Sequence, residues 1–321
     1  FIANAATLQA MSSGLTRLVQ PLHRVFHWRR ENTRDGSRRN IAAHYDLGND
    51  FYKLWLDDTM AYSAGIFESQ SATMRDASIA KMDRLCRKLR LTPSDHLLEI
   101  GTGWGGLAIH AAQQFGCRVT TTTISRRQFE FARERIAALN LADRVTVLRE
   151  DYRDLRGQYD KLVSVEMIEA VGHQYFDTFF RKVGGLLRPH GQACIQAITV
   201  ADRFYEHARR DVDFIKRYIF PGSCLPSIAV MSDSIARVTD ITITHVEDIT
   251  AHYARTLRLW RDAFLARHEQ VGALGLPQSF IRMWEFYLCY CEAGFAQRTI
   301  GTVQMSMVKP AAAYGPILGT I

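Results

Sequence analysis

The chain has 321 residues, of which 47% are hydrophobic and 23% are charged, so it can bury a substantial core and is not expected to be disordered. No run of about 18 apolar residues occurs, which argues against a transmembrane helix and leaves only peripheral membrane contact. The net charge of +7 favours an anionic partner, but it does not distinguish nucleic acid, an anionic bilayer and an acidic ligand.

The six cysteines show neither a CxxC pair nor a histidine-rich segment with zinc-ligand spacing. We therefore expect no metal site and no disulfide framework. Mostly buried, reduced thiols fit a cytoplasmic protein better.

Residues 1–39 are expected to form an N-terminal helix and a basic linker. Apolar residues recur at helical spacing over 5–26, and an arginine-rich stretch follows at 27–39. This stretch is interpreted either as a solvated linker or as a patch for lipid headgroups. Because the chain begins with Phe1, we expect the region to be the remnant of a larger N-terminal part.

The remainder, residues 40–321, is predicted to be one catalytic domain of the α/β class. Residues 40–90 are expected to be mostly helical, up to a turn at 92–95. Short apolar runs then alternate with amphipathic stretches, which predicts parallel βαβ units in a Rossmann-like doubly wound sheet. The predicted strands are 96–100, 118–124, 144–148, 161–165 and 191–200, separated by helices at 104–115, 126–139 and 174–187.

Residues 200–240 break this alternation and are long enough for a lid or a substrate-binding insertion. Helical patterns return at 251–270 and 278–295, and a last strand is predicted near 300–309. The segment 278–295 is apolar on nearly every side, so it is interpreted as buried core or as the lining of an acyl channel.

A glycine-rich loop, LEIGTGWGG (98–106), follows the first predicted strand and precedes a helix. Its GxGxxG spacing permits a tight turn and close approach of a ligand to the backbone. Dinucleotide enzymes share this spacing, so the loop alone does not identify the ligand.

Two acidic positions favour S-adenosylmethionine over a dinucleotide. Glu99 precedes the first glycine, where a carboxylate attracts the ammonium group of a methionine and repels a pyrophosphate; pairing with an arginine or capping of the next helix is the alternative. The acid that a dinucleotide site needs about 20 residues further on is absent from residues 121–128. Asp151 and Tyr152 stand where an adenine could be hydrogen-bonded and stacked, or in a loop turn.

Several segments together resemble the cyclopropane fatty acid synthase family, which includes the mycolic acid methyltransferases. They are NIAAHYDLGNDFYKLWLDDTMAYSAGIF (40–67), LEIGTGWGG, TTISRRQ (122–128), EDYRDL (150–155), SVEMIEAVG (164–172), RYIFPGSCLPS (217–227) and HYARTLRLW (252–260). The resemblance implies a class I methyltransferase fold, S-adenosylmethionine as donor, and a phospholipid or carrier-bound alkene as acceptor. It also implies a bicarbonate ion bound beside the reacting carbons.

Position by position, the resemblance implies two sets of contacts. The cofactor would contact Tyr62, Ser63, Gly101, Gly103, Thr123, Gln128 and Asp151. The bicarbonate would lie among Glu169, Tyr253 and the backbone near Ala64 and Ile198.

Two positions depart from the best-known members. Ala64 stands where the family often has cysteine, and Gln196 stands where it often has histidine. Gln196 can donate or accept a hydrogen bond but cannot carry a proton. The segment Gln196-Ala197-Ile198, together with SVEMIEAVG, resembles a subgroup of the family in which not every member forms cyclopropanes.

The expected reaction adds a methyl group to the double bond and leaves a cation on the neighbouring carbon. Bicarbonate held by Glu169, Gln196 and Tyr253 would remove a proton from the new methyl group, which closes a cyclopropane. Removal at another carbon would give a methylene- or methyl-branched chain. Aromatic walls would suit the cation, with Tyr45, Phe220, Tyr253 and Trp260 as candidates.

The expected partner is an unsaturated phospholipid acyl chain in a bilayer, reached by peripheral contact with the anionic inner face of the membrane from the cytoplasm. A homodimer is a candidate assembly. The competing hypotheses are a lipid- or cofactor-binding protein without catalysis and a nucleic-acid methyltransferase. The sequence lacks the combination of aromatic and basic residues that is typical of RNA-binding segments, so nucleic acid is not expected as a partner.

Overall fold

The structure is a computed structural model, and it describes residue 33, residues 36–37 and residues 47–313. The predicted helix over 5–26, most of the basic linker and Tyr45 therefore lie outside the described residues. Within the described part, no helix is long and apolar enough to cross a membrane.

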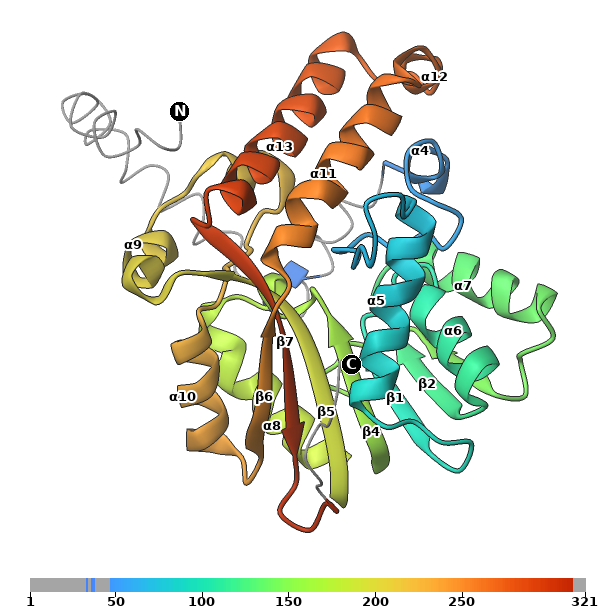
Figure 1. Cartoon of the computed structure of the whole chain (residues 1–321), viewed down its shortest axis with the longest axis vertical. Coiled ribbons are helices and arrows are strands. Elements are labelled where there is room, and N and C mark those ends of the chain that lie inside the picture. The colour runs from blue at the N-terminus through green and yellow to red at the C-terminus, as the bar shows by residue number, and fades with distance from the viewer. Residues whose placement is uncertain (1–32, 34–35, 38–46, 314–321) are drawn as a thin grey trace.

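A seven-stranded sheet forms the centre of the molecule (Figure 1). Its order is β3-β2-β1-β4-β5-β7-β6. The first five strands in this order pair in parallel, whereas β7 pairs antiparallel with both β5 and β6. The strands are β1 His96–Ile100, β2 Arg118–Thr122, β3 Val145–Leu148, β4 Tyr159–Val165, β5 Leu187–Val200, β6 Thr242–Asp248 and β7 Ile300–Val308.

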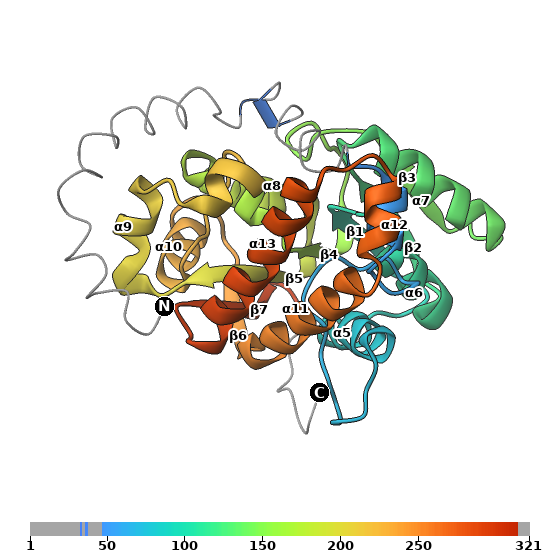
Figure 2. The same ribbon diagram turned by 90° about the horizontal axis from the view of Figure 1, so that it is seen from above.

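Helices cover both faces of the sheet, which confirms the predicted doubly wound α/β fold (Figures 1 and 2). Two separate apolar clusters fill the two interfaces between helices and sheet. One face carries α5 Met74–Lys88, α6 Gly106–Phe115 and α7 Arg126–Ala138, and the other carries α8 Phe176–Leu186 and α10 Ile228–Val238.

Local signals in the sequence fix several helix ends. Thr73 and Asp76 form a reciprocal capping box at the start of α5. Ser125 and Ser227 accept backbone hydrogen bonds at the starts of α7 and α10. Gly116 ends α6 in the left-handed conformation, which glycine adopts at little cost.

A helical layer covers the sheet edge at which the parallel strands end (Figure 1). In this layer α11 (Thr250–Leu265) packs against α13 (Gln278–Ala296), and a third apolar cluster joins both helices to α4 (Asn49–Lys53). The layer contains α4 Asn49–Lys53, α11 Thr250–Leu265, α12 His268–Ala273 and α13 Gln278–Ala296, while α9 Tyr205–Arg210 lies to one side.

Two predictions about elements were incomplete. Residues 54–73 form turns and extended chain between α4 and α5, so the region 40–90 is less helical than expected. An Asx turn, in which Thr59 N donates to Asp57 Oδ1 at 2.8 Å, supports this non-helical path. Strand β6 was not predicted, because its residues are half-buried or exposed and give no buried apolar run.

Candidate active site

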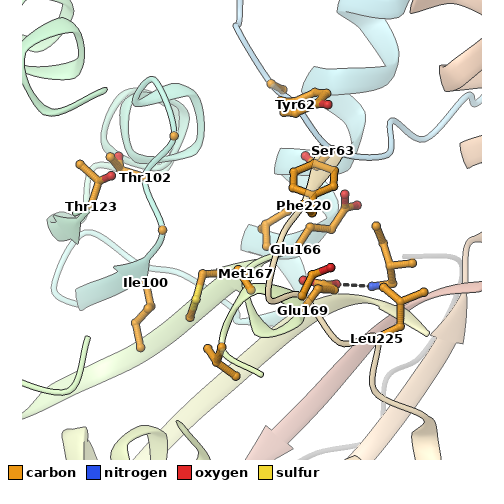
Figure 3. Close-up of a pocket in the computed structure, with 18 of the residues that line it drawn as sticks. Tyr62, Ser63, Ile100, Thr102, Thr123, Glu166, Met167, Glu169, Phe220 and Leu225 are labelled. Carbon is orange, nitrogen blue, oxygen red and sulfur yellow. Dashed lines mark hydrogen bonds between the residues drawn. The ribbon is translucent and has the colours of Figure 1, made fainter. Parts of the chain in front are cut away.

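A cavity of about 540 Å³ lies between the carboxyl edge of the sheet and the helical layer. Figure 3 shows Ile100, Thr102 and Thr123 on one side of it and Glu166 and Glu169 on another. Parallel strands bind ligands at this edge, most readily where neighbouring connections leave in opposite directions. That switch occurs between β1 and β4, since the chain passes from β1 to β2 on one side and later to β4 on the other.

The glycine loop between β1 and α6 forms the floor of the cavity. Gly101 and Gly103 have φ values of 98° and 52°, which side chains rarely adopt. A Cβ at Gly103 would meet nothing within 4 Å, whereas one at Gly106 would lie 2.8 Å from Thr59 O. The loop therefore needs glycine both for its conformation and for close packing.

Glu99 is buried beside this loop and lines the cavity. Its carboxyl group accepts a hydrogen bond from Thr121 Oγ1 rather than capping the next helix. Burial raises the pKa of Glu99 to about 7, although Thr121, Thr102 and the charge of Lys81 oppose the shift. A cationic ligand group nearby would favour its anionic form.

The predicted adenosine contacts gather beyond β2 and β3 in the same cavity wall. Thr123 Oγ1 donates to Gln128 Oε1 at 2.9 Å. Asp151 is held by Arg153, whose Nε and Nη2 donate to its two oxygens at 2.8 and 2.7 Å. Tyr152 packs edge-on against a buried phenylalanine, and its hydroxyl has no partner among the described residues.

The non-helical segment before α5 brings Tyr62 and Ser63 to the opposite wall (Figure 3). The Tyr62 hydroxyl lies 2.8 Å from the Tyr287 hydroxyl of α13. Lys81 Nζ, which is buried on α5, donates to Ser63 Oγ at 2.9 Å.

Glu166 lies directly after β4, and sequence reasoning did not assign it a role. Oε1 accepts hydrogen bonds from Ala64 N at 3.0 Å and from Gln196 Nε2 at 2.8 Å. Oε2 accepts one from the Tyr253 hydroxyl at 2.6 Å. The carboxylate thus occupies a cradle of three donors from three distant parts of the chain.

The orientation of Gln196 is set by a chain of buried amides behind it. Lys88 Nζ donates to Gln304 Oε1 at 2.8 Å, and Gln304 Nε2 donates to Gln196 Oε1 at 2.9 Å. An ammonium group can only donate, so each amide in turn presents its NH₂ group toward Glu166. Lys88 is itself buried and paired with Glu247.

The second carboxyl group, that of Glu169, lies near Glu166 in the cavity wall (Figure 3). Its Oε1 accepts from Ile198 N, and Oε2 has no hydrogen-bond partner among the described residues. Burial, followed by the charge of Glu166, raises the pKa of Glu169 to about 8. Burial also raises the pKa of Glu166, but Tyr253, Ala64, Gln196 and Lys81 oppose that shift.

The structure does not fit the expected bicarbonate. Three of the groups expected to surround it, Ala64 N, Gln196 and Tyr253, already donate to the Glu166 carboxylate. The fourth, Ile198 N, donates to Glu169. Gln196 and Ala64 are fully buried and do not line the cavity, so they support Glu166 from behind.

Aromatic side chains complete the site, although not all the expected ones take part. Tyr253 lines the cavity and stacks on Phe295 with ring centroids 4.2 Å apart. Phe220 also lines it, but Trp260 is buried behind Tyr253 and does not. Residues Tyr287, Tyr290, Cys291 and Gly294 of α13 border the cavity, so this helix both packs in the core and lines the site.

Comparisons with known proteins point to one family. A family model described as mycolic acid cyclopropane synthetase matches residues 32–305. The chain is 40% identical to tuberculostearic acid methyltransferase UfaA1 of Mycobacterium tuberculosis, over 89% of this chain and 71% of that protein. It is 36% identical to the cyclopropane-fatty-acyl-phospholipid synthase of Escherichia coli K12, over 80% of this chain and 64% of that protein.

A solved structure agrees with this similarity. Mycolic acid cyclopropane synthase CmaA1, complexed with SAH and CTAB, superposes with a TM-score of 0.80 at 32% identity. The match covers 85% of this chain and 98% of the other.

Proposed function

Because this chain belongs to the mycolic acid cyclopropane synthetase family of S-adenosylmethionine-dependent methyltransferases, we propose that it transfers a methyl group to the double bond of an unsaturated phospholipid acyl chain. The observation that carries the proposal is the shared cavity. It joins a glycine loop for the cofactor to a carboxylate pair and aromatic walls suited to a carbocation.

The residues of the glycine loop and its surroundings fit the cofactor. Glu99, Gly101 and Gly103 would hold its methionine part, Thr123 and Gln128 its ribose, and Asp151 and Tyr152 its adenine. Tyr62 and Ser63 would close the site from the opposite wall. When bound, S-adenosylmethionine supplies a strongly electrophilic methyl group.

The apolar part of the cavity suits an acyl chain. Ile198, Leu225 and Leu257 contribute aliphatic surface, and Phe220 and Tyr253 contribute aromatic surface. Such walls exclude water from a reaction in which the alkene is a weak nucleophile. Their ring faces also attract a developing positive charge.

Two kinds of product follow from one cationic intermediate, depending on which proton is removed. Loss of a proton from the added methyl group closes a cyclopropane, which is the product expected from the resemblance. Loss from a neighbouring chain carbon leaves a methyl-branched unsaturated chain. If a hydride first shifts to the cation from the methylated carbon, loss from the added methyl group instead leaves a methylene-branched chain. The 40% identity to a protein named tuberculostearic acid methyltransferase favours a branched product.

The test incubates purified protein with isotopically labelled S-adenosylmethionine and liposomes of mono-unsaturated phospholipid. Mass spectrometry and proton NMR of the released fatty acid esters then identify the product. A gain of one CH₂ with upfield ring protons shows a cyclopropane, and vinylic or exocyclic methylene protons show a branched chain. Cofactor binding without label in any lipid would contradict the proposal and favour a binding protein without catalysis.

We also propose that an exposed aromatic cluster makes peripheral contact with the anionic inner face of the membrane from the cytoplasm. Tyr218, Phe286 and Tyr290 surround Phe214, and the exposed fractions of the first two are 53% and 52%. The Arg217 guanidinium lies 5.2 Å from the Tyr218 ring centre, which places positive charge beside the cluster.

Vesicle co-sedimentation tests this contact. We expect binding to anionic phospholipid vesicles to weaken in the double variant Tyr218→Ser/Phe286→Ser. Leu139→Ser removes an apolar side chain outside the cluster that is 44% exposed, and it serves as the control. Equal binding by all three proteins, or no preference for anionic lipid, would contradict the proposal. Light scattering on the same preparations would show whether the protein forms the expected homodimer.

A further inference from the structure

We propose that the carboxylate of Glu166 is the resident base of the reaction and takes the place that the resemblance gives to bicarbonate. This inference rests on the proposed methyl transfer to an alkene. It changes the identity of the proton acceptor from a diffusible ion to a side chain of the enzyme.

The donor cradle is the first argument. Ala64 N, Gln196 Nε2 and the Tyr253 hydroxyl converge from 2.6 to 3.0 Å on the two oxygens of Glu166. A carboxylate and a bicarbonate present similar planar oxygen pairs, so one set of donors serves either. Here the side chain already satisfies all three donors.

The second argument is the direction of the hydrogen bonds that run from Lys88 through Gln304 and Gln196 to Glu166. Because Lys88 fixes the orientation of Gln304 and Gln304 fixes that of Gln196, Glu166 Oε1 meets an N–H donor and must accept. With Ala64 N, this oxygen receives two N–H donors, a setting that favours a carboxylate over a protonated acid. The network therefore stabilises the ionised form that a base requires.

The contrast with Glu169 is the third argument. Glu169 Oε1 accepts from Ile198 N, Oε2 has no hydrogen-bond partner among the described residues, and the pKa of Glu169 is raised to about 8. Of two neighbouring carboxyl groups in a buried site, one keeps its proton and the other remains ionised. The hydrogen bonds assign the charge to Glu166 and the proton to Glu169.

The position and backbone of Glu166 are consistent with this role. The residue lines the cavity, so its oxygens can be reached by a substrate. Its φ of 48° lies in the left-handed region, which is costly for glutamate and recurs at functional sites. Its backbone N donates to Gln196 O at 2.8 Å, which holds the residue in place.

The proton transfer balances without another reactant. As the new C–C bond forms, the methyl–sulfur bond breaks, and S-adenosylhomocysteine leaves while a cation remains on the adjacent alkene carbon. Glu166 then takes a proton from a carbon next to that cation or from the added methyl group. The electron pair of the broken C–H bond forms a double bond in the first case and a cyclopropane bond in the second. The protonated Glu166 later releases its proton to solvent.

A bicarbonate ion bound beside Glu169 is the competing arrangement, since Glu169 Oε2 has no partner among the described residues. Such an ion would lie near the Glu166 carboxylate in a largely buried site. Like charges repel strongly where water is excluded. We therefore expect bicarbonate to bind weakly at this position unless Glu166 is removed.

The first experiment measures bicarbonate binding directly and does not depend on activity. Carbon-13 NMR with labelled bicarbonate is recorded on the wild-type protein and on Glu166→Ala, which empties the cradle. We expect binding only to Glu166→Ala, seen as line broadening of the bicarbonate signal. Broadening by the wild-type protein that Glu166→Ala abolishes would overturn the inference, whether or not the protein methylates lipid.

The second experiment measures methyl transfer in buffer stripped of carbon dioxide and in buffer with added bicarbonate. We expect wild-type turnover to be the same in both, and Glu166→Gln to lose about 10²–10⁴-fold in turnover while still binding S-adenosylhomocysteine. Bicarbonate should restore part of the activity of Glu166→Ala. Glu130→Gln removes an exposed carboxylate of α7 and controls for charge.

The outcomes separate the two proposals. Wild-type turnover that falls when bicarbonate is removed, together with an active Glu166→Gln, would overturn the role of Glu166 and leave the proposed function intact. A wild-type protein that methylates no lipid under either condition would instead overturn the proposed function. In that case the NMR comparison still decides whether the side chain or the ion occupies the cradle.

Discussion

The side-chain amide of Gln196 donates a 2.8 Å hydrogen bond to Glu166 Oε1, and the register of two parallel strands places the two residues together. Val165, the last residue of β4, pairs with Gln196 of β5, so Glu166 begins its turn directly beside that amide. A shift of one residue in this register would point Gln196 to the other face of the sheet. The sheet itself therefore aligns the proposed base.

Replacement of Gln196 by leucine should destabilise the protein. The substitution leaves the Gln304 amide without its acceptor and Glu166 without one donor in a fully buried region. We expect a loss of about 1–3 kcal/mol in the free energy of unfolding, measured by chemical denaturation. Gln158→Leu, which removes an exposed hydrogen bond to Gly185 O, is the control and should have little effect. Equal stabilities of the two variants would contradict this interpretation.

Replacement of Tyr253 by phenylalanine should move the pH dependence of turnover. The ring remains stacked on Phe295, but Glu166 loses a donor that lowers its pKa. Its remaining neighbours are Ala64 N, Gln196, the Lys81 charge and Glu169. Since the base acts when ionised, we expect turnover to fall at low pH and recover at higher pH. A loss of the same factor at every pH would show that the hydroxyl acts in another way.

Replacement of Glu169 by glutamine should change how stability depends on pH. The pKa of Glu169 is raised from 4.5 to about 8, so the folded state keeps a proton that the unfolded state releases. This contribution to stability is complete below about pH 4.5 and is lost as the pH rises to about 8. We therefore expect the wild type to lose stability relative to Glu169→Gln over this range, as measured by thermal unfolding at several pH values. A constant difference between the two proteins would contradict the raised pKa.

Replacement of Gly101 by alanine should weaken cofactor binding. At φ 98° an alanine costs about 1–2 kcal/mol, and its Cβ would lie 3.2 Å from Met167 Cγ. We expect a lower affinity for S-adenosylhomocysteine in calorimetry, by about tenfold if the strain is relieved by moving the loop. Gly185→Ala on the exposed side of α8 has open space and no positive φ, so it should leave binding unchanged. Unchanged affinity of Gly101→Ala would exclude the loop from the cofactor site.

The parallel half of the fold was predictable because its signals are local. Short apolar runs ended in turn residues, and the glycine loop marked the edge at which the cavity lies. Strand β6 was not predictable in this way, because it lies at the sheet edge and its residues are half-buried or exposed. Its partner β7 agrees with the strand predicted near 300–309, and residues 302–307 are continuously buried.

The prediction of the site was incomplete where its residues come from distant parts of the sequence. The resemblance pointed to Glu169 and Tyr253, and both line the cavity. Glu166 lies in the same segment, SVEMIEAVG, but the resemblance implies no role for it, although a carboxylate directly after a parallel strand is a signal for a ligand site. Lys88 and Gln304 could not have been linked, because they are 216 residues apart in the sequence and meet only in the folded chain.

The position of strand β7 late in the sequence determines when, during synthesis, the support of the proposed base is complete. Gln304 orients the proposed base but is synthesised 138 residues after Glu166, which corresponds to a delay on the order of ten seconds during translation. A chain that still lacks β7 contains Glu166 and its three donors, but Gln196 lacks the Gln304 amide that orients it toward Glu166. The strand β7, made late in synthesis, therefore adds the final support behind the proposed base.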